Sequence, residues 1–257
     1  MKRGRNATNL AESRPFAFDS RVDFQEEDHA YFVDGRRVAV SVSEVVKRGF
    51  PDTFDPSAVI RKNLGVWRRR ASSTYHGLVV DKTDEEAEAA VLAQWERGRN
   101  AGTALHKHAE LWLNGQPGSG EVPRGEVDLL FRGWELLNAA GHEIVRTELS
   151  VFWPPQGEAK AAGMIDFLTR TAQGYAVVDL KRSSKDLTCS ARAFRNGLGA
   201  LAAVGDTSHA RYSLQLSLYA VMVQELTRAP VEKLLLLQVD PEEGTVRVVP
   251  CSDLRAQ

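Results

Sequence analysis

The sequence predicts an α/β fold in which a mixed central sheet is flanked by helices. Helical periodicity dominates the first half, three alternating segments follow, and a further helix precedes two last alternating segments. The chain has 257 residues, 43% hydrophobic and 26% charged, a composition typical of a soluble globular protein with one sizeable core. No apolar run approaches the roughly 18 residues of a membrane span. We therefore expect a soluble, intracellular protein without a membrane partner.

The N-terminus carries basic residues but no apolar signal segment. Residues 1–21 lack periodicity and are expected to be disordered. Lys2, Arg3 and Arg5 leave two interpretations open, a frayed terminus and a mitochondrial transit peptide. An organelle or a nucleus therefore stays open as the location if the protein is eukaryotic or viral. The rest of the chain, 22–257, is expected to form one domain, with a hairpin and helical region at 22–120 and a core region at 121–257.

A hairpin and a capped helix are predicted next. Residues 22–40 alternate, and their Asp34-Gly35 pair is typical of a tight hairpin turn. Ser41 or Ser43 can accept a hydrogen bond from the first turn of a helix that begins near Glu44.

Two or three helices are expected between residues 55 and 115, and one more after them. The clearest spans 84–114 and starts with acidic side chains, which the helix dipole favours there. A break near Gly98 or Gly102 is allowed for, because glycine weakens a helix interior. The next helix, at 123–140, has apolar side chains at helical spacing, and Gly141 suits its C-cap.

The period then changes from helical to alternating, which predicts three strands. A tight turn at 172–174 joins the last two of them. Helical spacing returns once before a final strand pair. The predicted strands are 144–153, 162–170, 174–182, 233–239 and 245–249, and the helix is 210–226.

Two carboxylates and one lysine occupy the predicted hairpin in the middle of the chain. Residues i and i+2 of a strand point to the same face, so Asp179 and Lys181 project together, and the pairing can bring Asp166 beside them. Carboxylate oxygens suit a hard cation such as Mg²⁺ or Mn²⁺, which polarises a phosphoryl oxygen and lowers the pKa of bound water. A lysine beside the metal can orient that water. The pattern therefore indicates phosphodiester hydrolysis, although a structural ion pair at a strand end gives the same spacing.

A helical segment with two histidines is the second candidate. His106 and Glu110 are four residues apart and share a helix face, whereas His108 points to a different face. The segment lacks the H-E-x-x-H spacing of metalloproteases. Taken alone, these histidines are more typical of a surface or of a hydrogen-bonded core position.

A helix near the C-terminus is the third candidate. Gln215 and Tyr219 share a helix face, and Tyr212 lies one turn before Gln215. Such a face can donate hydrogen bonds to a phosphate and stack on a base. A core helix with a buried tyrosine is the alternative.

The charge and the cysteines narrow the classes of protein. The net charge is −1, so a nucleic-acid enzyme would depend on a local basic surface. Cys189 and Cys251 are compatible with a reducing compartment. No C-x-x-C pair exists, which excludes a zinc ribbon or a four-cysteine iron–sulfur cluster supplied by this chain. The candidate basic residues are Arg68, Arg69, Arg70, Arg182, Lys185, Arg192 and Arg195.

The order of these motifs resembles a known enzyme family. G-T-x-x-H-x-x-x-E, followed by G-x-x-D, D-x-K and Q-x-x-x-Y, resembles the RecB-like branch of the PD-(D/E)xK nuclease superfamily. The segment from His29 to Gly35 and the Phe54-Asp55 loop are similar to viral and organellar members related to the mitochondrial genome maintenance exonuclease. The motifs cover 102–219, and residues 1–100 match only loosely. The matching residues are Gly102, Thr103, His106, Glu110, Gly163, Asp166, Asp179, Lys181, Gln215 and Tyr219.

The resemblance implies a restriction-endonuclease-like fold and a metal centre. By similarity, Asp166 and Asp179 would ligate the metal with the Leu180 carbonyl, and Lys181 would position or activate the attacking water. His106 would add a ligand from the helix. Further candidate ligands are Glu110, in support or at a second metal, and Glu148, which also fits an ordinary strand surface.

The same resemblance implies contacts with nucleic acid. Gln215 and Tyr219 would hold the DNA backbone or brace the site. The helical region before residue 115 is expected to form a gate over the substrate, with aromatic side chains that either stack on bases or belong to the core. The remaining candidate contacts are Tyr212, Arg182, Ser183 and Lys185.

Two departures from the family's pattern affect the expected cofactor. The acid of the D-x-K motif is Asp rather than Glu, which the family permits. The cysteines that frame an iron–sulfur cluster in some RecB-like nucleases are absent. We therefore expect Mg²⁺ or Mn²⁺ without an iron–sulfur cluster, and any arch over the DNA must be held by packing alone.

The resemblance implies a DNA exonuclease that acts on single-stranded or frayed ends in recombination, repair or replication, alone or beside a helicase or recombinase. A flap nuclease or other structure-specific endonuclease uses the same chemistry and stays open. A non-catalytic DNA-binding subunit is less favoured, because every expected acidic position is filled. A metallohydrolase with another substrate would leave the D-x-K hairpin unexplained.

Overall fold

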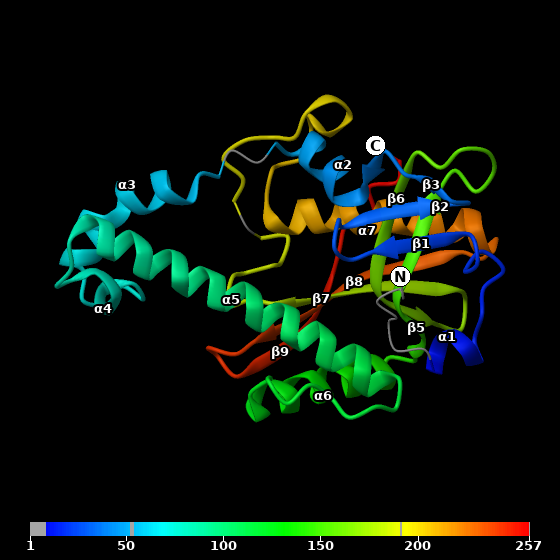
Figure 1. Cartoon of the computed structure of the whole chain (residues 1–257), viewed down its shortest axis with the longest axis horizontal. Helices are drawn as coiled ribbons and strands as arrows, with labels where there is room; N and C mark the ends of the chain where they lie inside the picture. Colours follow the sequence, from blue (N-terminus) through cyan, green and yellow to red (C-terminus); the bar gives the residue numbers. More distant parts are fainter. Residues whose placement is uncertain (1–8, 52–53, 191, 257) are drawn as a thin grey trace. The chain divides into compact units, whose positions relative to one another are not determined.

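The computed structural model describes residues 9–51, 54–190 and 192–256 (Figure 1). The chain divides into two compact units. The larger unit consists of Met1–Pro51 and Leu105–Gln257, and the smaller unit consists of Asp52–Ala104. Among the described residues, every helix is too short or too polar to cross a membrane.

A mixed six-stranded sheet forms the centre of the larger unit, as the sequence predicts. Its order is β4-β6-β7-β8-β9, and β5 pairs with β6. The β5–β6, β6–β7 and β8–β9 pairs are antiparallel, whereas β4–β6 and β7–β8 are parallel. The strands are β4 (Val40–Ser41), β5 (Glu143–Trp153), β6 (Ala161–Arg170), β7 (Tyr175–Arg182), β8 (Val231–Asp240) and β9 (Thr245–Pro250).

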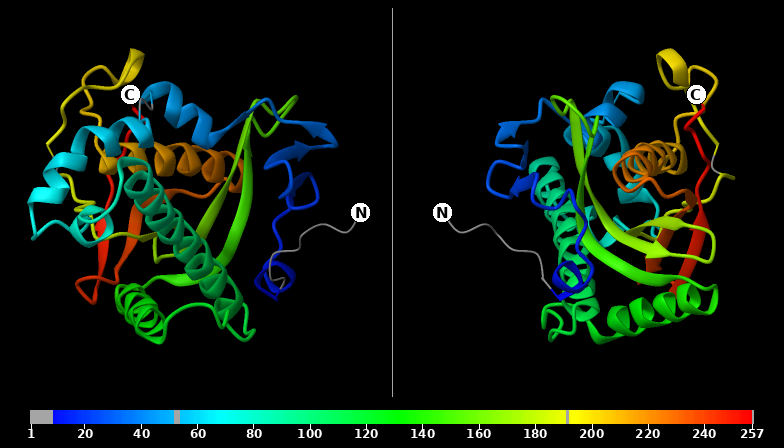
Figure 2. Two further views of the ribbon diagram at one scale, coloured as in Figure 1. Left: turned by 60° about the vertical axis from the view of Figure 1, so that its left-hand side comes forward. Right: turned by 90° about the vertical axis from the view of Figure 1, so that its right-hand side faces the viewer.

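Two helices cover opposite faces of this sheet (Figure 2). Helix α6 (Arg124–Ala139) packs on the face that carries Leu237, and its Gly133 lies so close that an added Cβ would be 2.6 Å from Leu237 Cδ1. Helix α7 (Ser208–Thr227) contacts β5, β7 and β8, and its apolar side chains share one core cluster with Leu236. Successive residues of a strand face opposite sides, so Leu236 and Leu237 place the two helices on different faces.

The N-terminal segment from residue 9 onward is part of the larger unit. Strands β1 (Val22–Gln25), β2 (Ala30–Val33) and β3 (Arg36–Arg37) form a small antiparallel sheet. Its second turn uses positive φ angles at Asp34 (51°) and Gly35 (77°), as the Asp-Gly pair predicts. Disorder is expected before residue 22, yet helix α1 (Asn9–Ser13) forms, Phe18 is buried, and Asp19 pairs with Arg146 at 2.7 Å. Residues 1–8 lie outside the described residues.

Helix α2 (Val42–Gly49) begins where the sequence predicts a cap. Ser41 is the N-cap and accepts a hydrogen bond from the Glu44 amide, while the Glu44 carboxylate accepts one from the Ser41 amide. This reciprocal capping box fixes the start of the helix directly after β4. Helix α2 then contacts α7, β4 and β6.

The smaller unit is helical, as expected for residues 55–115. It contains α3 (Pro56–Arg69), α4 (His76–Val79) and the first part of α5 (Asp84–Leu113). Helix α5 runs without a break through Gly98 and Gly102. Its buried core is aliphatic, and partly buried aromatic side chains pack against that core. Trp95 Nε1 donates to Tyr75 Oη at 2.9 Å, and the Tyr75 and Trp67 rings lie 4.4 Å apart.

Candidate metal centre

The regular pairing of the sheet is interrupted at two acidic residues, Glu148 and Asp166. Glu148 of β5 stands opposite Asp166 of β6, between the pairs Thr147–Phe167 and Leu149–Ile165. Glu148 has a φ of 45°, a conformation that non-glycine residues seldom adopt. The pairing of β6 with β7 ends at Phe167–Val178.

The Asp166 side chain occupies the place where β6 and β7 separate. Its Oδ2 accepts a hydrogen bond from the main-chain N–H of Leu180 at 2.8 Å. In a continuous sheet, a carbonyl of the neighbouring strand would accept that hydrogen bond instead. This hydrogen bond fixes the carboxylate against β7. The D-x-K strand is thereby joined to Asp166 through the backbone of its central residue.

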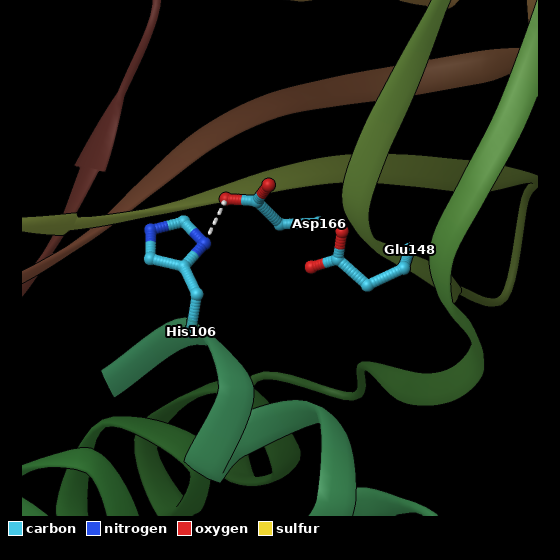
Figure 3. A group of neighbouring side chains, drawn as sticks. All are labelled: His106, Glu148 and Asp166. Carbon is cyan, nitrogen blue, oxygen red and sulfur yellow. Dashed lines mark ion pairs between the residues drawn. The ribbon is translucent and has the colours of Figure 1, made fainter. Parts of the chain in front are cut away.

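Three side chains from three elements meet beside this opening. His106 comes from α5, Glu148 from β5 and Asp166 from β6, and a ligand atom of each lies within 4.8 Å of the others (Figure 3). His106 Nδ1 is 3.4 Å from Asp166 Oδ2. One imidazole and two carboxylates can together hold a divalent metal ion.

Negative charge is crowded at this position. Burial raises the pKa of Glu148 well above its usual value, and the charges of Asp166 and Glu110 raise it further. Burial likewise raises the pKa of Asp179 to about 6, against the opposing effect of Lys181. A cation would relieve this repulsion, because metal binding favours the deprotonated carboxylates.

Asp179 and Lys181 form a close ion pair near the three candidate ligands. Asp179 is only 4% exposed, and its Oδ2 lies 2.6 Å from Lys181 Nζ. Burial lowers the pKa of Lys181, but Asp179 and Asp166 outweigh that effect and leave it raised, so the lysine stays charged. The ammonium also lies 5.0 Å from the centre of the Tyr212 ring, within the range of a cation–π contact.

The other candidate ligands are placed differently. Glu110 is buried and its Oε2 lies 2.6 Å from Lys107 Nζ, so its carboxylate already has a cationic partner outside the group of three. Among the described residues, the group whose ligand atoms lie within 4.8 Å of one another is His106, Glu148 and Asp166, and Asp179 is not part of it. The proposed roles of Asp179, Glu110 and the Leu180 carbonyl as ligands remain predictions.

Two separate motifs form one packing unit behind the site. Tyr219 is 5% exposed, and Gln215 Nε2 donates to its hydroxyl at 3.5 Å. The tyrosine ring lies against Gly163, where an added Cβ would be 2.7 Å from Tyr219 Cε1 and 3.0 Å from Val42 Cγ2. The glycine of G-x-x-D therefore makes room for the tyrosine of Q-x-x-x-Y. This burial favours the bracing role of Tyr219 over direct contact with DNA.

The candidate nucleic-acid contacts differ in their accessibility. The Arg182 guanidinium binds both carboxylate oxygens of Glu126 on α6, at 2.7 and 2.8 Å, which makes it a tie between β7 and α6. Tyr212 is half-buried under Lys181. Lys185 is exposed and Ser183 is partly exposed, so of these residues Lys185 is the best placed to meet a phosphate.

Tyr31 of β2, to which the sequence motifs assign no role, lies in the same core cluster as Tyr219. Burial, followed by the negative charge of Glu148, raises its pKa. Tyr31 also contributes to the raised pKa of Tyr219, after the larger effect of burial. The small N-terminal sheet therefore lies near both Glu148 and Tyr219. The resemblance of the segment from His29 to Gly35 was the one indication that this hairpin contributes.

The two histidines of α5 are expected to respond differently to substitution. His106→Ala should weaken Mn²⁺ binding at least about tenfold, because it deletes a candidate ligand. His108 is buried and its Nδ1 lies 2.9 Å from the Ser119 carbonyl, so His108→Ala should cost about 1–3 kcal/mol of stability and leave metal affinity unchanged. Calorimetric Mn²⁺ titration and thermal unfolding of both variants measure the difference. Equal losses of metal affinity would contradict the assignment of His106.

Comparisons with known proteins give distant likenesses. No protein-family model and no curated protein sequence matches the chain. One similar solved structure, a protein of Eubacterium rectale described as a "Putative exonuclease", shares 11% identity at a TM-score of 0.36, over 83% of this chain and 73% of that one. Another, SSO0001, shares 17% identity at a TM-score of 0.27 over half of each chain.

Proposed function

We propose that this protein is a metal-dependent nuclease that hydrolyses phosphodiester bonds in DNA. One observation carries the proposal. The His106–Glu148–Asp166 cluster and the Lys181–Asp179 ion pair both lie where the pairing of β6 with β7 ends. The motif order, which resembles that of RecB-like PD-(D/E)xK nucleases, supports the same chemistry.

Each group has a role in this proposal. His106, Glu148 and Asp166 hold the metal, with Asp179 as a fourth candidate ligand. A bound Mg²⁺ or Mn²⁺ would supply Lewis acidity toward a phosphoryl oxygen and lower the pKa of a coordinated water. Lys181, which stays charged beside Asp179, would orient the attacking water and offset the charge that develops on the phosphate.

The preferred form of the proposal is an exonuclease on single-stranded or frayed DNA ends, acting in recombination, repair or replication. The support for this form is the motif resemblance alone. A helicase or recombinase partner belongs to the same proposal. A gate formed by the helical region before residue 115, which would restrict entry of the strand, belongs to the same proposal.

End-labelled single-stranded, duplex, flap and circular DNA, each with Mg²⁺, Mn²⁺ or EDTA, tests the proposal. We expect cleavage of linear single strands with either metal, none in EDTA, and resistance of circles. An Asp166→Asn preparation made in parallel controls for contaminating nuclease. Cleavage of circles would favour the endonuclease form, and the labelled products would give the polarity. Absence of metal-dependent cleavage on every substrate would contradict the nuclease proposal.

A further inference from the structure

A long loop leaves the candidate site and returns to it. Residues 183–190 and 192–207, here called the β7–α7 loop, come after Lys181 and Arg182 and before the helix that carries Tyr212 and Tyr219. Both ends of the loop are therefore fixed to elements of the site. The loop therefore connects the strand of the D-x-K motif to the helix of the Q-x-x-x-Y motif.

The first part of the β7–α7 loop is anchored to the sheet. Gln238 of β8 donates from Nε2 to the carbonyls of Ser183 and Lys185, at 2.8 Å each. Leu187 is buried in the main core cluster. The loop therefore leaves the strand along a defined path.

The second part of the loop is anchored to the helices. Arg195 and Arg211 both bind Asp206, at 2.6 and 2.7 Å. Main-chain hydrogen bonds join Asp206 to Arg195 at 2.7 Å and Gly197 to Val204 at 2.9 Å, and Leu201 packs in a cluster with Phe50. This ordered turn begins at the residue immediately after Phe194.

Phe194 lies directly before this ordered turn, and its side chain is exposed to solvent. Its relative exposure is 96%, the highest among the large hydrophobic residues described as exposed. Single exposed apolar residues are ordinary on a protein surface. Here, however, Leu198, with 56% exposure, lies four residues further along the same loop. Two large apolar side chains thus remain uncovered, Leu198 within the hydrogen-bonded turn and Phe194 directly before it.

The same loop also carries two exposed, positively charged side chains. Arg192 and Lys185 are exposed, and within the described part of the chain neither takes part in an ion pair. The acids of the loop are engaged: Asp186 accepts hydrogen bonds from Thr188 and Ser190, and Asp206 binds two arginines. An exposed aromatic ring and exposed cations on one loop can bind single-stranded nucleic acid, because the ring can stack on a base and the cations attract the backbone.

We propose that Phe194 stacks on an unpaired base of the strand to be cleaved, while Arg192 and Lys185 attract its phosphates. The inference rests on the proposed function for the choice of DNA as partner, and it deepens that function by naming a contact outside the metal centre. A stacked base on the β7–α7 loop would position the strand without reading its sequence, because every base has an aromatic face.

The test compares binding of two fluorescent oligonucleotides of equal length in EDTA, where cleavage is absent. One is oligothymidine, and the other carries abasic sites in place of every base. Phe194→Ala should weaken oligothymidine binding about tenfold and change abasic binding less than twofold, since only stacking is lost. Phe194→Trp should retain wild-type binding. Leu136→Ala is the matched control, because Leu136 is also an exposed apolar residue (49%) but lies on α6.

The outcomes separate this inference from the nuclease proposal. Unchanged oligothymidine binding by Phe194→Ala, or an equal loss on both oligonucleotides, would overturn the stacking role. No binding by the wild-type protein would overturn it as well. Wild-type protein that binds oligothymidine with the expected Phe194 dependence, but does not cut DNA with Mg²⁺ or Mn²⁺, would support the stacking contact and contradict the nuclease.

Discussion

Asp166→Asn is expected to lower metal-dependent DNA cleavage by at least about a thousandfold while leaving the fold in place. The carboxylate is one of three ligands in the proposed centre, and a metal ion contributes several kcal/mol of transition-state stabilisation, at about 1.4 kcal/mol for each factor of ten. The asparagine oxygen can still accept the Leu180 N–H at the Oδ2 position, which preserves the link to β7. Cleavage rates on labelled single strands, with circular dichroism of the same samples, measure both parts of the expectation.

Asp128→Asn provides the matched control for this substitution. Asp128 is an exposed carboxylate on α6, so its replacement removes the same charge away from the site. Wild-type cleavage by both variants would show that Asp166 does not serve the reaction. Loss of cleavage with an unfolded circular dichroism spectrum would call for a structural role of Asp166 instead.

Lys181→Ala is expected to reduce cleavage about a hundredfold or more and to shift its pH dependence. The ammonium lies 2.6 Å from Asp179 Oδ2 and opposes the rise in pKa that burial imposes on that carboxyl, which stands at about 6. Removing the cation raises the pKa of Asp179 further, because a buried carboxylate without a partner is costly. Asp179 would then stay protonated to a higher pH. The acid limb of the cleavage rate, measured from pH 5 to 9, should therefore move upward.

Two further variants sharpen this second prediction. Lys181→Arg retains the positive charge and should restore the position of the acid limb, but with a lower rate because the guanidinium differs in shape. Lys233→Ala removes an exposed lysine of the neighbouring strand and should behave as the wild type. If Lys181→Ala cuts DNA at the wild-type rate, the site is misassigned.

Local periodicity predicted those parts of the fold that depend on neighbours in the sequence. The alternation of β7 brought Asp179 and Lys181 to one side, and the structure shows them in contact. The helical period of α5 separated His106 from His108, which lie near Asp166 and Ser119 respectively. Turn chemistry at Asp34-Gly35 was equally direct.

Features that depend on tertiary register could not be obtained in this way. The opposition of Glu148 and Asp166 follows from the β5–β6 register and the unusual φ at Glu148, neither of which a single strand reveals. The partner of Arg182 is Glu126, which lies on α6 and far away in the sequence. Disorder was expected before residue 22 because that segment lacks a period, yet Phe18 finds a place in the core. Such contacts are made by the whole fold rather than by a local pattern.

The contact between Gly163 and Tyr219 has a consequence for how this chain can vary. Any side chain at position 163 meets the tyrosine ring within 2.7 Å, and both residues are buried. A larger residue at 163 is therefore tolerated only if the ring at 219 becomes smaller, and loss of the ring opens a cavity behind β6. We therefore expect substitutions at positions 163 and 219 to be correlated, although the two motifs lie 56 residues apart in the sequence.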